Sequence, residues 1–167
     1  MPTSLTKRVR FGLAAGVLTG AVALGAVVPS QAQAAVAPRT AVSSSVLAQA
    51  AAASGGFYVH GGTSPRGFDC SGFIFYVFNR AGRSMERDIW SQYDSGPHIT
   101  REQLQPGDLV FFQNTYMEGL SHNGVYVGNG EFINAVGEDT GVGISRLSSP
   151  YWAERWYGAT RPRSQRS

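Results

Sequence analysis

The segment from Asp69 to Gly82 constrains the fold of this chain more than any other. Its centre, Phe73 to Phe78, is a run of six consecutive apolar residues. Aromatic and branched side chains alone would also allow a strand. Asp69, however, suits a helix N-cap, and Gly82 suits the position just after a helix C-terminus. We therefore predict a helix that is apolar on nearly all sides and buried, with Cys70 in its first turn.

After residue 103 the pattern changes to short apolar runs separated by turns. Pro106-Gly107-Asp108 predicts a turn, and Gly128-Asn129-Gly130 predicts the loop of a β-hairpin. The predicted strands are 109–112, 122–127, 131–136, 141–147 and 156–160. A short helix is predicted at 44–53, and no element is assigned to the polar stretch 83–103. One buried helix followed by an antiparallel sheet indicates an α+β domain.

The first 34 residues have the order of a secretory signal peptide. Lys7, Arg8 and Arg10 precede an apolar run at 11–28, and Ala32-Gln33-Ala34 is a small-x-small cleavage signature. An uncleaved membrane anchor is the alternative, because the run is close to the ~18 residues at which a spanning helix becomes plausible. We expect export with cleavage after residue 34, a linker at 35–43, one domain at 44–161 and a basic tail at 162–167.

Charge in the mature chain is balanced. Removing residues 1–34 leaves 133 residues, enough for one compact domain and too few for two. Lys and Arg fall from 14 to 11 and match the 11 acids, so the formal net charge drops from +3 to 0. This balance gives no support for nucleic-acid binding. Arg161, Arg163 and Arg166 are interpreted as a solvated tail rather than an attraction to an anionic wall or membrane surface.

Cys70 is the only cysteine, which excludes a disulfide within the chain. A lone cysteine in an exported protein is an intermolecular link, an inert buried side chain or a reactive thiol. Cys70 lies at the polar edge of the predicted helix, where first-turn amides and the helix dipole favour a thiolate. We interpret it as a reactive thiol. Gly72 beside it is expected to leave room for a substrate backbone.

A nucleophilic cysteine needs a base, and the mature chain offers His60, His98 and His122. His98 follows a proline in a polar segment and is interpreted as a surface loop residue. His122 begins a predicted strand, rigid on one side and open to a cleft on the other. We therefore expect His122 to serve Cys70.

The predicted hairpin register brings Asn134 to His122. A three-residue loop pairs Val127 with Glu131 and makes His122 and Asn134 diagonal neighbours on one face. Asn134 could then accept from one imidazole nitrogen and leave the other for Cys70. A two-residue loop would place the two side chains on opposite faces.

Four ordered motifs closely resemble the NlpC/P60 family of papain-like cell-wall cysteine peptidases. They are Tyr58-Val59-His60-Gly61-Gly62, Phe68-Asp69-Cys70-Ser71-Gly72, Pro106-Gly107-Asp108-Leu109-Val110-Phe111-Phe112 and His122-Asn123-Gly124-Val125-Tyr126-Val127-Gly128-Asn129-Gly130-Glu131-Phe132-Ile133-Asn134-Ala135. The resemblance runs from about residue 46 to 161. It implies a papain-like α+β peptidase domain that hydrolyses peptidoglycan stem peptides, usually between γ-D-glutamate and the following diamino acid.

The resemblance also implies roles for individual residues. Cys70 matches the nucleophile, His122 the base and Asn134 the orienting position, where many relatives have a second histidine. Tyr58 matches a tyrosine near the nucleophile that binds substrate or stabilises the oxyanion, with plain packing as the alternative. Ser71 and Asp69, which flank the thiol, are included with Tyr58 as substrate-binding or oxyanion residues.

Two features depart from the family pattern. His60 stands where relatives usually carry an aromatic residue. On an extended segment it would share a face with Tyr58, where it could touch substrate, compete as the base or fill the aromatic's space; we favour the last. The segment 114–121, with Tyr116 and Met117, is either a loop over the cleft or a surface turn.

Three other functions remain as alternatives. They are a catalytically silent wall-binding module, a thiol acyltransferase or lipid hydrolase on a related fold, and a zinc enzyme. The retained Cys70, His122, Asn134 and Tyr58 argue against the first, and the absence of any close-spaced ligand pair argues against the last. We expect a secreted or wall-associated monomer that acts on stem peptides without a cofactor, a metal, nucleic acid or stable membrane anchoring.

Overall fold

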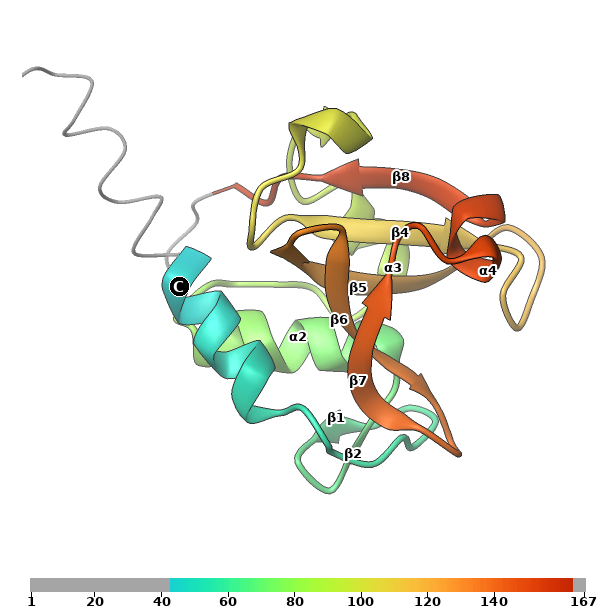
Figure 1. The fold of residues 1–167 in the computed structure, drawn as a ribbon. Helices are drawn as coiled ribbons and strands as arrows, with labels where there is room; N and C mark the ends of the chain where they lie inside the picture. Colours follow the sequence, from blue (N-terminus) through green and yellow to red (C-terminus); the bar gives the residue numbers. More distant parts are fainter. Residues whose placement is uncertain (1–42, 164–167) are drawn as a thin grey trace, which may run out of the picture.

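A computed structural model describes residues 43–163 of the chain. The predicted signal peptide and residues 164–167 of the predicted tail lie outside this range, as does the linker apart from residue 43. Figure 1 shows two helices packed beside a twisted sheet: one over residues 43–52, the other α2 (Cys70–Arg80). Both agree with the sequence prediction. Within 43–163, no helix has the length and apolar character needed to cross a membrane.

The sheet is antiparallel, with six strands in the order β3-β8-β4-β5-β6-β7. Its strands are β3 (His98–Ile99), β4 (Leu109–Gln113), β5 (Leu120–Gly128), β6 (Glu131–Gly137), β7 (Gly141–Arg146) and β8 (Trp156–Thr160). A separate two-stranded hairpin, β1 (Thr63–Ser64) and β2 (Gly67–Phe68), precedes α2. The predicted α+β class is therefore confirmed, and all five predicted strands are present.

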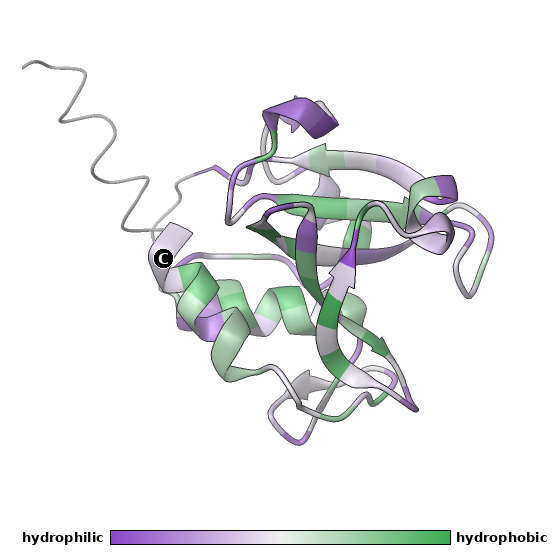
Figure 2. Ribbon diagram, in the orientation of Figure 1, coloured by the Kyte–Doolittle hydropathy of each residue, from purple (hydrophilic) through white to green (hydrophobic). Residues whose placement is uncertain are grey.

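The apolar run of β4 supplies both faces of the sheet. Leu109 and Phe111 join the core under the helices, together with Phe73 of α2. Val110 and Phe112 point to the opposite face, because successive side chains of a strand alternate. Figure 2 shows the apolar stretches concentrated on α2 and the central strands. A strand buried on both faces explains why this run is continuous rather than alternating.

Three short elements lie in the polar stretch 83–103, where the sequence predicted none. They are α3 (Ile89–Tyr93), β3 and the 3-10 helix η1 (Arg101–Gln103). Asp88 caps α3 by accepting from the amide of Ser91 at 2.9 Å. Another unpredicted helix, α4 (Pro150–Glu154), begins with proline after Ser149, which is a recognisable helix start. Helices of five residues or fewer and two-residue strands are too short for periodicity to detect.

The β5–β6 hairpin turns on two residues, Asn129 and Gly130, rather than on the predicted three. Both have positive φ, 54° and 75°, as a type I′ turn requires. Gly128 pairs with Glu131, so the predicted pairing of Val127 with Glu131 is wrong. The register shifts at Val127, which forms a bulge and adds one residue to β5.

Candidate active site

Cys70 is the first residue of α2, directly after the N-cap. Asp69 Oδ1 accepts from the amide of Gly72 at 2.7 Å, as the predicted cap requires. The Cys70 thiol donates to the carbonyl oxygen of Ser121 on β5 at an Sγ–O distance of 3.8 Å. The thiol-bearing end of α2 therefore meets β5 at the residue before His122.

His122 and Asn134 lie in contact. The bulge restores the central register, with Val125 opposite Ile133, so both side chains stay on one face as predicted. His122 Nε2 lies 2.9 Å from Asn134 Oδ1. The Asn134 amide group donates to Ser145 Oγ at 3.0 Å, which fixes which way the amide points. Since Oδ1 can only accept, Nε2 carries the ring proton and Nδ1 is left as the acceptor.

Aromatic side chains enclose the imidazole. Trp152 of α4 stacks on the His122 ring at a centroid distance of 4.9 Å and 26° between planes. The Phe112 ring lies 6.3 Å away. His122 is 4% exposed, and this burial lowers the pKa of its imidazole from 6.5 to about 4, against a smaller opposite effect of Asn134. The sequence analysis missed Trp152, although Ser149-Pro150 marks the start of its helix.

The thiol is neutral when considered alone. Cys70 is 4% exposed, and burial, followed by the Asp69 charge, raises its pKa from 9.0 to about 11. The backbone amides of Ser71 and Cys70, and then Arg87, act in the opposite direction. The first-turn amides do favour the thiolate, but desolvation outweighs them. A thiolate here requires a cation that forms with it, and imidazolium at His122 would be one.

Tyr58 lies beside the thiol. It is half-buried and forms a parallel bridge with Phe68. Burial raises the pKa of its hydroxyl, and the charges of Cys70 and Asp69 act in the same direction. Tyr58, Cys70 and Asp69 thus share one electrostatic environment.

His60 and His98 lie apart from this group. The segment after Tyr58 is not extended, because Gly62 donates to the Val59 carbonyl at 2.8 Å and places the exposed His60 in a turn. The expected shared face of His60 and Tyr58 is therefore absent. His98 is at the surface as expected but belongs to β3 rather than a loop. It stacks on Tyr93 at 4.0 Å.

Gly72 serves the chain itself rather than a substrate. A Cβ at this position would lie 1.9 Å from the Gly62 carbonyl oxygen. The absence of a side chain therefore lets the turn after Tyr58 approach α2. The expectation that Gly72 leaves room for a substrate backbone is corrected accordingly.

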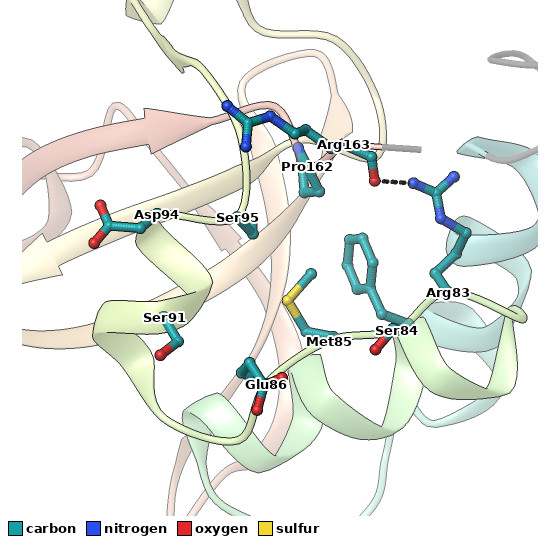
Figure 3. A pocket seen from close by; sticks show the side chains of 10 residues that line it. Arg83, Ser84, Met85, Glu86, Ser91, Asp94, Ser95, Pro162 and Arg163 are labelled. Atoms are coloured by element: carbon teal, nitrogen blue, oxygen red, sulfur yellow. Dashed lines mark hydrogen bonds between the residues drawn. The ribbon is translucent and has the colours of Figure 1, made fainter. Parts of the chain in front are cut away.

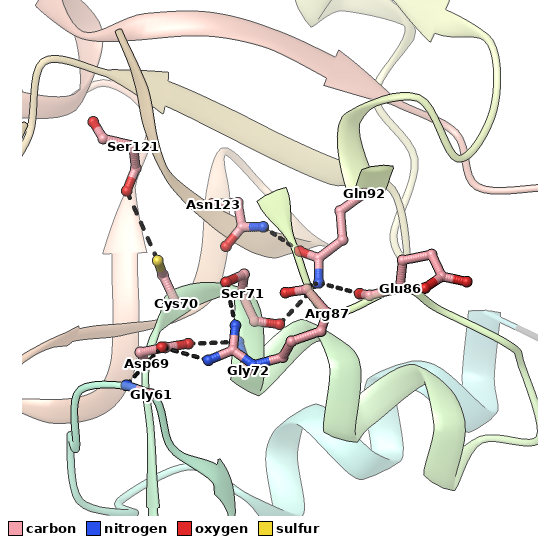
Figure 4. A network of polar contacts seen from close by, with 10 residues as sticks. All are labelled: Gly61, Asp69, Cys70, Ser71, Gly72, Glu86, Arg87, Gln92, Ser121 and Asn123. Atoms are coloured by element: carbon pink, nitrogen blue, oxygen red, sulfur yellow. Dashed lines mark hydrogen bonds and ion pairs between the residues drawn. The ribbon is translucent and has the colours of Figure 1, made fainter. Parts of the chain in front are cut away.

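A polar network surrounds the first turn of α2 (Figure 4). Arg87 donates to Asp69 Oδ2 at 2.5 Å and to Ser71 Oγ at 2.6 Å. Gln92, which is fully buried, donates to the Ser71 carbonyl at 2.9 Å and accepts from Asn123 at 2.6 Å. Sequence analysis missed Arg87, Gln92 and Asn123 as members of the site, because no local pattern links them to Cys70.

The turn at 114–119 is anchored close to the thiol. Asn114 and Gly119 close it by two hydrogen bonds of 2.8 Å. Thr115 donates to Ser121 Oγ from both its amide and its hydroxyl, at 3.0 and 2.9 Å. Burial raises the pKa of the adjacent Tyr116 hydroxyl, and the charge of Cys70 is the second cause. The turn and the thiol thus both contact Ser121, and the two interpretations, a loop over the cleft and a surface turn, stay predictions.

No group of three or more His, Cys, Asp or Glu side chains within residues 43–163 is arranged to hold a metal ion. The described site instead holds a thiol that contacts the backbone at Ser121 and, at the next residue, an imidazole bound to an amide. Such a set supports nucleophilic attack with proton transfer.

Comparisons with known proteins agree with this geometry. The probable peptidoglycan endopeptidase LytE of Bacillus subtilis is 45% identical over 123 residues, which cover 71% of this chain and 34% of that protein. The gamma-DL-glutamyl hydrolase of the same organism is 43% identical over 106 residues, which cover 62% of this chain and 25% of that one. This chain therefore spans only about a quarter to a third of the length of these relatives.

A solved structure shows the same fold. The crystal structure of an NlpC/P60 family protein from Bacillus cereus superposes with a TM-score of 0.67 at 31% identity, over 72% of this chain and 40% of that one. Residues 55–161 also match the sequence profile of the NlpC/P60 family. This match covers most of the chain, and with the papain-like arrangement of α2 against the sheet it establishes that the chain belongs to the NlpC/P60 family.

Proposed function

We propose that this protein is a peptidoglycan hydrolase, a cysteine peptidase that cleaves stem peptides. Cys70 is the nucleophile, His122 the base and Asn134 the residue that orients the base. One observation carries the proposal. The Cys70 thiol contacts the backbone of β5 at Ser121, immediately before an imidazole whose proton is fixed on Nε2 by Asn134.

The reaction follows from these positions. His122 Nδ1 takes the proton from Cys70 Sγ, and the thiolate attacks the scissile carbonyl carbon. The oxyanion is stabilised by the backbone amide of Cys70 and the hydroxyl of Tyr58. The intermediate then collapses to a thioester as the amine leaves with the proton from His122. Water, deprotonated by His122, hydrolyses the thioester and regenerates the thiol.

The environment of the pair keeps both groups uncharged until the proton moves. The Cys70 pKa of about 11 and the His122 pKa of about 4 leave both groups neutral before substrate binds. Moving the proton creates two opposite charges in a poorly solvated site, where their attraction is strong. The amide of Asn134 carries no charge, so it orients His122 but adds little stabilisation to an imidazolium.

The bond that we expect to be cleaved is the one between γ-D-glutamate and the diamino acid of the stem peptide. The support is the family resemblance together with the 43% identity to a gamma-DL-glutamyl hydrolase. We place the exposed Tyr116 and Met117 at the edge of the substrate cleft, because the charges of Cys70 and Tyr58 both act on the Tyr116 hydroxyl. Asp69 and Ser71 flank the thiol there, whereas His60 lies in its turn and fills no catalytic role.

The location follows from the same proposal. Peptidoglycan lies outside the cytoplasm, and residues 1–34 have the order of an export signal. The mature protein would act as a secreted or wall-associated monomer, without nucleic acid and without a stable membrane anchor.

Digestion of purified muropeptides by wild type and Cys70→Ala tests the proposal. Mass spectrometry should find fragments that end in γ-D-glutamate with the wild type alone. Circular dichroism of Cys70→Ala should match the wild type, since the substitution removes only the sulfur atom. Identical digests from the two folded proteins would reject the peptidase assignment. Binding to peptidoglycan without any released fragment would instead identify the silent wall-binding module.

A further inference from the structure

The carboxylate of Asp69 is unusually constrained for a residue next to a nucleophile. It is 8% exposed and accepts three hydrogen bonds. They come from the amide of Gly72, the amide of Gly61 at 2.9 Å and the guanidinium of Arg87. The first fixes the start of α2 and the second fixes the turn that follows Tyr58. A negative charge is thereby held one residue from the Cys70 thiol, where it opposes formation of a thiolate.

Arg87 binds both sequence neighbours of the thiol. Its two terminal nitrogens reach Asp69 Oδ2 at 2.5 Å and Ser71 Oγ at 2.6 Å. A planar guanidinium that makes two such bonds fixes the distance and angle between its partners, which a lysine cannot do. The residue between those partners is Cys70 (Figure 4).

The segment 87–92, which contains Arg87, also contacts β5, the strand that carries His122. Gln92 donates to the carbonyls of Ser71 and Glu86, at 2.9 and 2.7 Å. Its oxygen accepts from Asn123, the residue after His122, at 2.6 Å. Residues 87–92 therefore connect the position beside the nucleophile with the position beside the imidazole.

We propose that Arg87 is a positioning residue for Cys70: it holds Asp69 and Ser71 on either side of the thiol and supplies the positive charge that offsets the Asp69 carboxylate. The inference rests on the proposed peptidase function only for its effect on turnover. The charge effect concerns the thiol itself and exists with or without a substrate.

The groups that face Cys70 give the expected sign. Asp69 raises the pKa of the thiol and Arg87 lowers it, and the Cys70 charge in turn raises the pKa of the Tyr58 and Tyr116 hydroxyls. His122 follows Ser121, whose carbonyl accepts from the thiol. Neutralising Arg87 leaves the carboxylate unopposed. The thiolate fraction below the thiol pKa then falls, and alkylation and catalysis slow together.

Alkylation of Cys70 by iodoacetamide across pH 6–11 tests the charge effect without a substrate. Arg87→Gln should lower the alkylation rate near neutral pH about tenfold, since one pKa unit is a factor of ten in thiolate. Arg87→Lys keeps the charge and should bring the alkylation profile back close to that of the wild type. With muropeptides, Arg87→Gln should lower kcat about tenfold and change KM less than twofold.

Two controls separate this role from a structural one. Arg146→Gln removes a surface ion pair with Glu131 and should leave the alkylation profile and the muropeptide kinetics unchanged. In an Asp69→Asn background, Arg87→Gln should cause a smaller loss of alkylation rate, because Arg87 there lacks the carboxylate that holds it beside the thiol. An Arg87→Gln profile that superimposes on the wild type, or an equal loss in both backgrounds, would overturn the proposal. Failure of the wild type to cleave muropeptides would reject the peptidase function but leave the alkylation result readable.

Discussion

The two ends of α2 are each accompanied by an arginine, and the two arginines meet different partners. At the N-terminal end, Arg87 binds the Asp69 carboxylate and the Ser71 hydroxyl. Beyond the C-terminal end, Arg83 is 5% exposed and donates to the carbonyl of Arg163 (Figure 3). Among the described residues, that carbonyl is the only hydrogen-bond partner of the Arg83 side chain, and its Nε atom is buried without a partner.

The difference shows what each guanidinium does. Arg83 and Ser95 line a cavity of about 210 Å³ and each leaves one buried polar atom unpartnered. Burial lowers the pKa of Arg83, and no carboxylate within residues 43–163 forms an ion pair with it. This arginine ties residue 163 to the segment that follows α2. Arg87, by contrast, sits where a charge acts on the thiol. Of the two arginines near the ends of α2, Arg83 therefore anchors a neighbouring segment and Arg87 affects the reactivity of the thiol.

The prediction with the largest expected effect tests whether the catalytic site lies at the N-terminal end of α2. His122→Gln should reduce muropeptide cleavage by at least about 10³-fold, as loss of the base does in nucleophilic hydrolases. Initial rates by chromatography of the fragments give the measurement. A variant that keeps more than a tenth of wild-type activity would remove His122 from the mechanism.

Acid stability is the next test. The folded protein keeps His122 neutral down to a pKa of about 4, whereas the ordinary value is 6.5, so the unfolded chain binds the extra proton in that window. The free energy of unfolding should therefore fall as the pH falls from 6.5 to 4, by up to roughly 3 kcal/mol. Urea unfolding at successive pH values measures it. His122→Gln should lose much of this slope and Arg83→Met should keep it.

A smaller effect is expected at the cleft edge. Tyr116→Ala should raise KM about fivefold, equivalent to roughly 1 kcal/mol of lost contact, and leave kcat within twofold. Steady-state kinetics on a purified stem peptide separate the two constants. Tyr151→Ala is a matched control, because Tyr151 is also an exposed tyrosine, in α4 beside Trp152. Equal KM values for the Tyr116 variant and the wild type would place the turn outside the cleft.

The smallest effect is expected at the C-terminal end of α2. Arg83→Met should change the free energy of unfolding by less than about 1 kcal/mol, because the lost hydrogen bond is offset by the relief of burying an unpaired charge. Activity per folded molecule should equal that of the wild type. Thermal unfolding measures the change in stability, and release of muropeptide fragments measures the activity. A large loss of activity would contradict the division of roles between the two arginines.

Local patterns were sufficient for the main elements. The caps of α2, the continuous apolar run of β4 and the Gly-Asn-Gly turn all act within a few residues, and each placed its element correctly. The period of two also put Asn134 on the same face as His122. That prediction assumed the wrong loop, and the correct pairing depends on a bulge at Val127 that no sequence rule required.

The sequence by itself determined the class of fold, the helix that presents Cys70 and the strand that carries His122, because these depend on neighbours in the chain. Only the tertiary structure decided the charge state of the thiol and the imidazole, which follows from their burial. It also decided the contacts of Arg87, Gln92 and Trp152, whose partners lie far along the chain. Solvent exclusion and long-range contacts arise only when the helix and the sheet pack together, and the reactivity of the sulfur depends on both.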